Sequence, residues 1–149
     1  MLSAKSNALA WLTIDLCRFT SATEVIGILE KVQDQIYTLI MDPCDCDAFA
    51  DVVQFAARCK NLRTLEMNLR KCTGPVTAES LEALARIESL SKLSLTQYKG
   101  KGLAHAAPFA QCHQLRTLKL RDCTPLCGVA DLAQSKYLHT LDLSGCTGL

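Results

Sequence analysis

The sequence predicts an α/β fold in which six short parallel strands alternate with helices that return along one face of the sheet. Two observations carry this prediction. A nine-residue pattern recurs six times along the 149 residues, and the segments between the copies place apolar residues at helical spacing. The composition agrees, because 49% hydrophobic residues can supply a core while 21% are charged. This length allows one ordinary domain or a short repeat array.

The recurring pattern reads apolar-x-x-apolar-x-apolar-x-x-Cys. Its six copies start 23 to 28 residues apart, at Leu9, Ile36, Leu62, Leu90, Leu115 and Leu138. In the third copy Cys72 comes two residues late, and in the fourth Tyr98 stands in the position of the cysteine. Copies at nearly constant spacing indicate one repeated structural unit.

The middle of each copy alternates between apolar and other residues, as in Leu118-x-Leu120. This alternation predicts a strand whose apolar side chains point to one face. Strands of three or four residues are too short to be stable alone. We therefore expect them to stack in parallel, so that their leucines form one continuous core.

The segments between the copies predict short helices. Apolar residues at helical spacing mark Thr23–Val32, Phe49–Ala57, Leu81–Glu88 and a brief last segment near Val129–Ser135. Thr77 is a suitable N-cap for the third of these helices. Pro108 lies inside the segment that follows the fourth copy, so we expect the helix there to be short or kinked.

Charge and hydropathy exclude several classes of function. The net charge of +1 argues against a nucleic-acid partner, because polyanion-binding domains are usually clearly basic. No apolar run reaches the roughly 18 residues that span a bilayer. The segment from Met1 to Ile14 is a poor signal peptide, since its apolar part is short. Nine cysteines cannot all pair with one another, which favours a reducing location, the cytoplasm or the nucleus.

Over residues 6 to 149 the pattern resembles the leucine-rich repeat family, in its cysteine-containing, ribonuclease-inhibitor-like class. That class repeats Cys-x-x-Leu-x-x-Leu-x-Leu-x-x-Cys, and two copies here carry the leading cysteine as Cys59-Lys-Asn-Leu62 and Cys112-His-Gln-Leu115. The resemblance implies one repeat array over residues 1–149 with an incomplete last repeat. It also implies a horseshoe-shaped solenoid with strands on the concave face and helices on the convex face.

Seven of the nine cysteines occupy positions of the repeat. The resemblance implies that these thiols are buried and satisfy carbonyl groups where the chain turns. Cys46 and Cys127 remain. The run Asp42-Pro-Cys44-Asp-Cys46 is either a metal ligand cluster or a turn before a helix, and its spacing is too tight for the common zinc knuckle. Cys127 is not assigned a base among the three histidines, and we place His105 on the outer, helical side. We expect no metal, no cofactor and no enzymatic activity.

The exposed face of the strands is the expected binding surface for another protein or a peptide. Six strands about 4.8 Å apart span about 24 Å, enough for a modest contact. The residues expected to contact a partner are Trp11, Tyr37, Ile40, Glu66, Lys92, Arg116, Lys119 and Arg121. Alternatives remain open, because Arg116 and Arg121 can instead pair with Asp142 or Asp122, and Trp11 can cover the first repeat.

The ends of the array lack clear polar caps, so we expect apolar, open strands at both ends. Such a chain is a fragment of a longer array, a truncated product, or a unit that associates end to end. The resemblance suggests a second function. Cysteine-containing arrays often follow an F-box, so the chain can be a piece of a ubiquitin-ligase substrate receptor. A thiol enzyme or a metal site is the third alternative.

Overall fold

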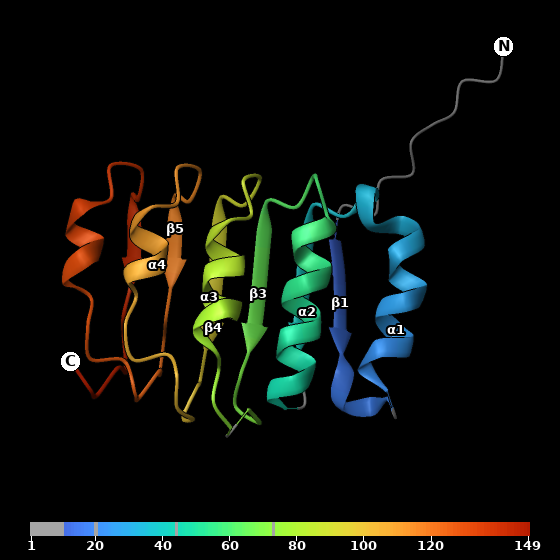
Figure 1. Ribbon diagram of the computed structural model, residues 1–149, viewed down its shortest axis with the longest axis horizontal. Helices are drawn as coiled ribbons and strands as arrows, with labels where there is room; N and C mark the ends of the chain where they lie inside the picture. Colours follow the sequence, from blue (N-terminus) through green and yellow to red (C-terminus); the bar gives the residue numbers. More distant parts are fainter. Residues whose placement is uncertain (1–10, 20, 44, 73) are drawn as a thin grey trace, which may run out of the picture.

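The computed structural model describes residues 11–19, 21–43, 45–72 and 74–149. These residues form one sheet of six parallel strands in the order β1-β2-β3-β4-β5-β6. The strands are β1 (Trp11–Asp15), β2 (Thr38–Asp42), β3 (Thr64–Asn68), β4 (Lys92–Thr96), β5 (Thr117–Lys119) and β6 (Thr140–Asp142). The predicted α/β class with six parallel strands is confirmed, and neighbours in the sheet are also neighbours in the sequence (Figure 1).

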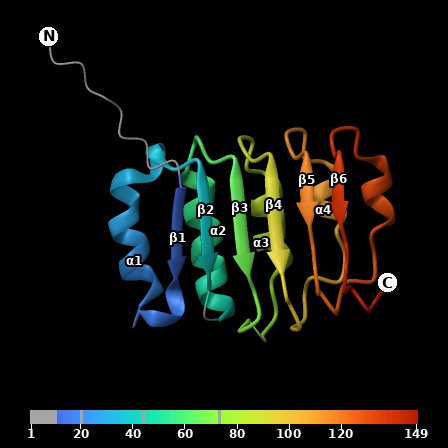
Figure 2. The same ribbon diagram turned by 180° about the vertical axis from the view of Figure 1, so that it is seen from behind.

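Helices follow the strands and lie together on one face of the sheet, as the views from the two sides show (Figures 1 and 2). The α-helices are α1 (Ala22–Leu29), α2 (Cys46–Arg58), α3 (Ala78–Ala85) and α4 (Ala107–Ala110). The 3₁₀ helices are η1 (Leu16–Arg18), η2 (Glu30–Gln35) and η3 (Ala130–Gln134). In the described part of the chain, no helix is long and apolar enough to cross a membrane.

Local rules account for where most of these helices begin and end. The expected cap of α3 is confirmed, since Thr77 Oγ1 accepts a hydrogen bond from the Ser80 amide at 3.2 Å. Asp45 caps α2 in the same way, accepting from the Ala48 amide at 2.7 Å. Pro108 sits in the first turn of α4, and that helix is only four residues long, as expected.

Two expected helices differ in type from the prediction. The segment predicted as one helix over Thr23–Val32 is α1 followed by the 3₁₀ helix η2. The segment near Val129–Ser135 is the 3₁₀ helix η3. A 3₁₀ helix rises about 2.0 Å per residue instead of 1.5 Å. In both places it therefore brings the chain to the next strand in fewer residues than an α-helix would need.

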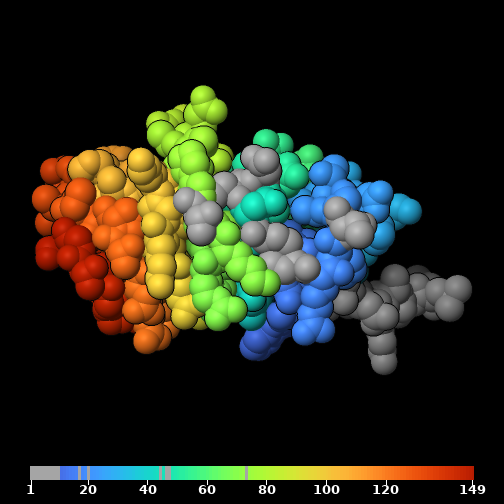
Figure 3. Space-filling view, turned by 90° about the horizontal axis from the view of Figure 1, so that it is seen from below, coloured from blue at the N-terminus to red at the C-terminus, as the bar shows by residue number. Residues whose placement is uncertain are grey.

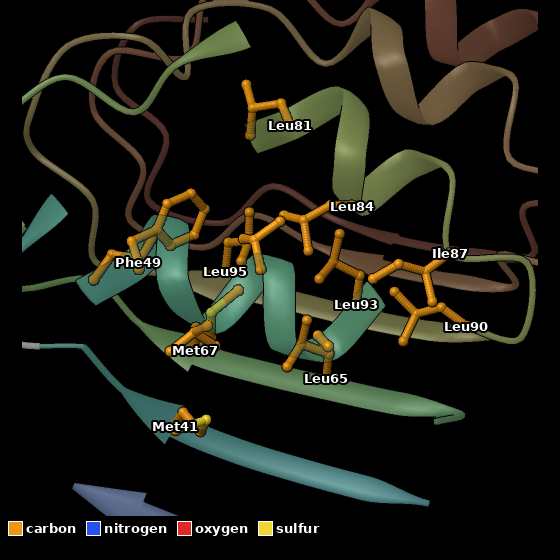
Figure 4. Packing of buried hydrophobic residues seen from close by; sticks show 14 of the residues in the cluster. Met41, Phe49, Leu65, Met67, Leu81, Leu84, Ile87, Leu90, Leu93 and Leu95 are labelled. Atoms are coloured by element: carbon orange, nitrogen blue, oxygen red, sulfur yellow. The ribbon is translucent and has the colours of Figure 1, made fainter. Parts of the chain in front are cut away.

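The core lies between the sheet and the helices. Equivalent residues of neighbouring strands stack in register, so that Leu39, Leu65, Leu93 and Leu118 form one row, and all four are fully buried. Helix residues such as Phe49 close the core from the other side (Figure 4). Each buried leucine contributes about 1.5–3 kcal/mol, which explains why the strands remain paired although they are short.

Cysteine thiols satisfy carbonyl groups where strands turn toward helices, as the resemblance implied. Cys72 donates to the Asp45 carbonyl at 3.1 Å, Cys123 to that of Leu95 at 3.5 Å, and Cys146 to that of Leu120 at 2.7 Å. Each of these bonds joins the connection that carries the cysteine to the neighbouring copy of the pattern. Before the strands, Cys59 and Cys112 also donate to backbone carbonyls. The side chain of Cys17 and residue Cys44 lie outside what the structure describes.

Tyr98 performs the same task with a longer side chain. It is fully buried, and its hydroxyl accepts a hydrogen bond from the Val76 amide at 2.9 Å. The same hydroxyl contacts the carbonyl oxygens of Gly74, at 2.8 Å, and of Lys101. The longer connection before α3 and the tyrosine in the next connection are therefore joined, because the Tyr98 hydroxyl bonds to the backbone of both.

Both end strands are less buried than the central ones, as expected. Leu12 and Ile14 of β1 are only partly buried. Leu141 of β6 is 42% exposed, whereas its neighbour in the same row, Leu118, is fully buried. Apolar side chains are thus accessible at both ends of the sheet.

Candidate functional site

The face of the sheet opposite the helices is not covered by any described element, as the view from that side shows (Figure 2). The strand register aligns its side chains in columns. The first column consists of Trp11, Thr38, Thr64, Lys92, Thr117 and Thr140. The second consists of Thr13, Ile40, Glu66, Ser94, Lys119 and Asp142. These are the columns that the repeat predicts.

Trp11 stands at the β1 end of this face and is 68% exposed. Its indole Nε1 donates to Thr13 Oγ1 at 3.1 Å, two residues further along the same strand. This bond holds the ring over the exposed face. A large aromatic side chain held in this way can contact a partner while losing little conformational entropy.

Ile40 belongs to β2, the strand beside Trp11, and Tyr37 directly precedes that strand. Ile40 is in the second column, between Thr13 and Glu66, and is partly buried. Tyr37 precedes β2 and is 40% exposed, and its carbonyl accepts from the Thr64 amide. Tyr37 therefore lies at the edge of the sheet where strands begin rather than on the face itself.

Glu66 and Lys92 form an ion pair across the middle of the sheet. Lys92 Nζ lies 2.5 Å from Glu66 Oε1, joining β4 to β3, and both side chains are about one-third exposed. The prediction named them separately, whereas the structure brings them together. Their opposite charges compensate, so the centre of the face is polar without net charge. An exposed pair of this kind contributes at most about 1 kcal/mol to stability.

The basic residues of the fifth repeat do not form a compact patch, because they are spread over β5 and the residues on either side of it. Arg116 precedes β5, Lys119 ends it, and Arg121 follows. At about 3.3 Å per residue, roughly 16 Å separates the backbone of Arg116 from that of Arg121. Arg116 and Arg121 are exposed, and Lys119 is partly buried.

One of the alternative pairings is present in the structure. Arg121 Nε lies 3.6 Å from Asp142 Oδ2 and donates to Ser144 Oγ at 3.1 Å. The side-chain and backbone hydrogen bonds from Ser144, helped by the charges of Arg121 and Lys119, hold the pKa of Asp142 below its ordinary value. In the described residues, Arg116 and Lys119 make no ion pair. Lys119 on this face, and Arg116 at the edge where β5 begins, are positive charges that remain for a partner.

The first two strands end in carboxylates. Asp15 pairs with Arg18 at 3.3 Å, and Asp42 lies beside Asp15 in register. Burial raises the pKa of Asp42, and the nearby Asp15 carboxylate acts in the same direction. The face therefore has aromatic and acidic groups at the β1 end, a neutral middle and basic groups at β5.

The candidates for thiol chemistry, His105 and Cys127, lie in neighbouring connections. His105 precedes α4 and forms an isolated parallel bridge with Gly128, directly after Cys127. The imidazole leaves no room for a Cβ at Gly128. His105 thus lies in the connection before α4 and not in the helix itself, next to the connection that carries Cys127. Cys127 is exposed, and its thiol donates to the Ala104 carbonyl at 3.5 Å.

Metal ligands are not gathered anywhere in the described residues, where no group of three His, Cys, Asp or Glu side chains could hold an ion. The structure describes only part of the cysteine run after β2. Cys44 and the side chain of Cys46 lie outside the described residues. Asp45 is described, and its side chain caps α2. For this residue, the structure agrees with a turn before a helix rather than with a metal ligand.

A groove on the helical side was missed by the sequence reasoning. It has a volume of about 890 Å³ and lies between the last turns of α3 and α4, with Arg86, Ile87, Phe109 and Gln111 among its lining residues. The groove is open because α4 has only four residues and leaves the end of α3 uncovered. Pro108 was the available signal, since it predicts a short helix at this place.

No protein-family model matches the chain, and comparison with the curated proteins gives no match.

Proposed function

We propose that the chain is a leucine-rich repeat array of the cysteine-containing class, a solenoid that acts as a non-enzymatic scaffold and binds another protein on the exposed face of its sheet. The repeated pattern supports the family assignment. The thiols that bond to carbonyls of the neighbouring repeat support the cysteine-containing class in particular.

The uncovered face of a parallel sheet is the observation that carries the proposal. Parallel sheets occur almost only with both faces covered, because each crossover places a helix on the sheet. Here the described helices all lie on one side. The polar and half-buried side chains of the columns keep the other side soluble, and a partner can cover them.

The distribution of side chains indicates how a partner would lie. Trp11, Tyr37 and Ile40 offer apolar contact at the β1 end, and exposed aromatic residues are frequent energetic centres of interfaces. Arg116 and Lys119 at β5 offer unpaired positive charge. A protein with an apolar protrusion and an acidic patch about four strands apart, roughly 19 Å, fits both ends.

Affinity capture with variants of the two ends tests this function. The first variant is Trp11→Ala, and the second reverses two charges, Arg116→Glu with Lys119→Glu. The matched control, Lys31→Glu with Lys60→Glu, makes the same change of charge on exposed residues away from this face. We expect the wild type and the control to retain the same partner and both face variants to lose it. Equal recovery by all four proteins would overturn the proposal.

A further inference from the structure

A second surface lies at the edge of the sheet where the strands end. The connections after β3 and β4 carry four exposed basic side chains, Arg70, Lys71, Lys99 and Lys101, which we call the basic edge. Figure 3 looks onto this side of the molecule, where the green segment after β3 lies beside the yellow segment after β4. None of the four residues belongs to the columns of the exposed face.

The two connections are fixed to each other by hydrogen bonds. The Val76 amide donates to the Lys101 carbonyl at 2.7 Å, and the Tyr98 hydroxyl bonds to Val76 and Gly74 in the first connection and to the Lys101 carbonyl in the second. Gly100 lies so close to the Gly74 carbonyl that a Cβ would not fit. The backbone beneath the basic side chains is therefore held in place before any ligand arrives.

The positive charge of this edge is not compensated locally. In the described part of the chain, none of the four side chains takes part in an ion pair. Arg70 and Lys71 act on Asp42, whose pKa they lower against the larger, opposite effect of burial. Asp42 on one side and the exposed Asp122 on the other limit the positive region to two connections.

We propose that the basic edge binds a short acidic segment of a protein. Ammonium and guanidinium groups on two adjacent, preorganised connections match a few neighbouring carboxylates. A nucleic acid is disfavoured, because the aromatic side chain of the edge, Tyr98, is buried and cannot stack on a base. The flanking aspartates would also repel a long polyanion. This inference goes beyond the proposed function, since it concerns a different surface and a different ligand chemistry.

Titration with a labelled octaglutamate peptide, followed by fluorescence anisotropy at low and physiological salt, tests the inference. We expect saturable binding that weakens as salt increases. Lys99→Glu with Lys101→Glu, and separately Arg70→Glu with Lys71→Glu, should each weaken it by about tenfold or more. The control, Lys31→Glu with Lys60→Glu, changes the total charge equally and should stay within about twofold of the wild type. Far-ultraviolet circular dichroism verifies that each variant is folded.

Three outcomes would overturn the inference. The first is no saturable binding to the wild type. The second is an equal loss in the control variant, which would mean that only total charge matters. The third is tighter binding of an oligothymidine of equal charge that is lost in the same edge variants, which would assign the edge to nucleic acid. The affinity capture with the Trp11, Arg116 and Lys119 variants changes no residue of the basic edge. The two proposals can therefore fail separately.

Discussion

At the scale of single residues, the cysteines whose side chains the structure describes comprise four buried thiols, the partly buried Cys146 and the exposed Cys127. Burial raises the pKa of Cys59 and Cys123 to about 12 and that of Cys112 to about 11. A thiol reacts as its thiolate, so these three are unreactive near neutral pH for two reasons, lack of access and lack of ionisation. Cys127 is exposed.

We therefore predict two rates of thiol modification in the folded protein at pH 8. A small disulfide reagent should modify Cys127 quickly, while Cys59, Cys112 and Cys123 should react only when denaturant is added. Mass spectrometry of the digested protein identifies the modified residues, and Cys127→Ser supplies the control that removes the fast modification assigned to that residue. Fast modification of Cys123 in native buffer would contradict the packing described for the strand ends.

The positions of these residues could be inferred from the sequence to different extents. The columns of the exposed face follow from the repeat alone, because equal steps along the chain place equivalent residues side by side. The Glu66–Lys92 pair does not follow from the repeat, and the Arg121–Asp142 pair was only one of several alternatives that the sequence left open. Each joins residues of neighbouring strands along a diagonal, and the direction of a long side chain depends on its rotamer rather than on its position in the repeat.

At the scale of elements, the sequence predicted helix starts and helix lengths correctly where they depend on residues close together in the chain. Thr77 needs only the next three residues to cap α3, and Pro108 acts on its own backbone. The hydrogen bonds between Tyr98 and the longer connection before α3 instead depend on residues that are distant in the sequence. The two lie more than twenty residues apart, at Val76 and Tyr98, so the sequence showed two unrelated departures where the structure has one joint feature.

Replacing Tyr98 with Phe tests these hydrogen bonds. The ring would still fill the core, but the hydrogen bonds of the hydroxyl to the Val76 amide and to the Gly74 carbonyl would be lost, while the Val76 amide keeps its bond to the Lys101 carbonyl. Each such hydrogen bond contributes about 0.5–1.5 kcal/mol, so we expect the loss of two of them to lower the free energy of unfolding, measured by urea titration, by about 1–3 kcal/mol. Tyr137→Phe is the matched control, because Tyr137 is exposed, and it should change stability by less than about 0.5 kcal/mol. Equal effects of the two substitutions would show that the hydroxyl of Tyr98 is not structural.

At the scale of the whole molecule, stability depends on how many neighbours each repeat has. One row of equivalent leucines allows this dependence to be tested, because Leu93, Leu118 and Leu141 are adjacent in register. Their chemistry and strand position are the same, and only their place in the array differs. Leu93 and Leu118 are fully buried, whereas Leu141 is 42% exposed.

Substitution of each leucine by Ala should therefore have unequal effects. Leu93→Ala and Leu118→Ala leave cavities between two covering strands and should each cost about 2–5 kcal/mol. Leu141→Ala removes a side chain that water already reaches, and its cost should be less than half as large, since less apolar area leaves the core. Urea unfolding of the three variants, measured side by side, gives the comparison. In an array whose stability is a sum of repeat and interface terms, the end repeat contributes one interface fewer. A loss at Leu141 as large as that at Leu93 would mean that something covers β6 in solution, and its dependence on protein concentration would then distinguish a second copy of the chain from a covering segment of the same chain.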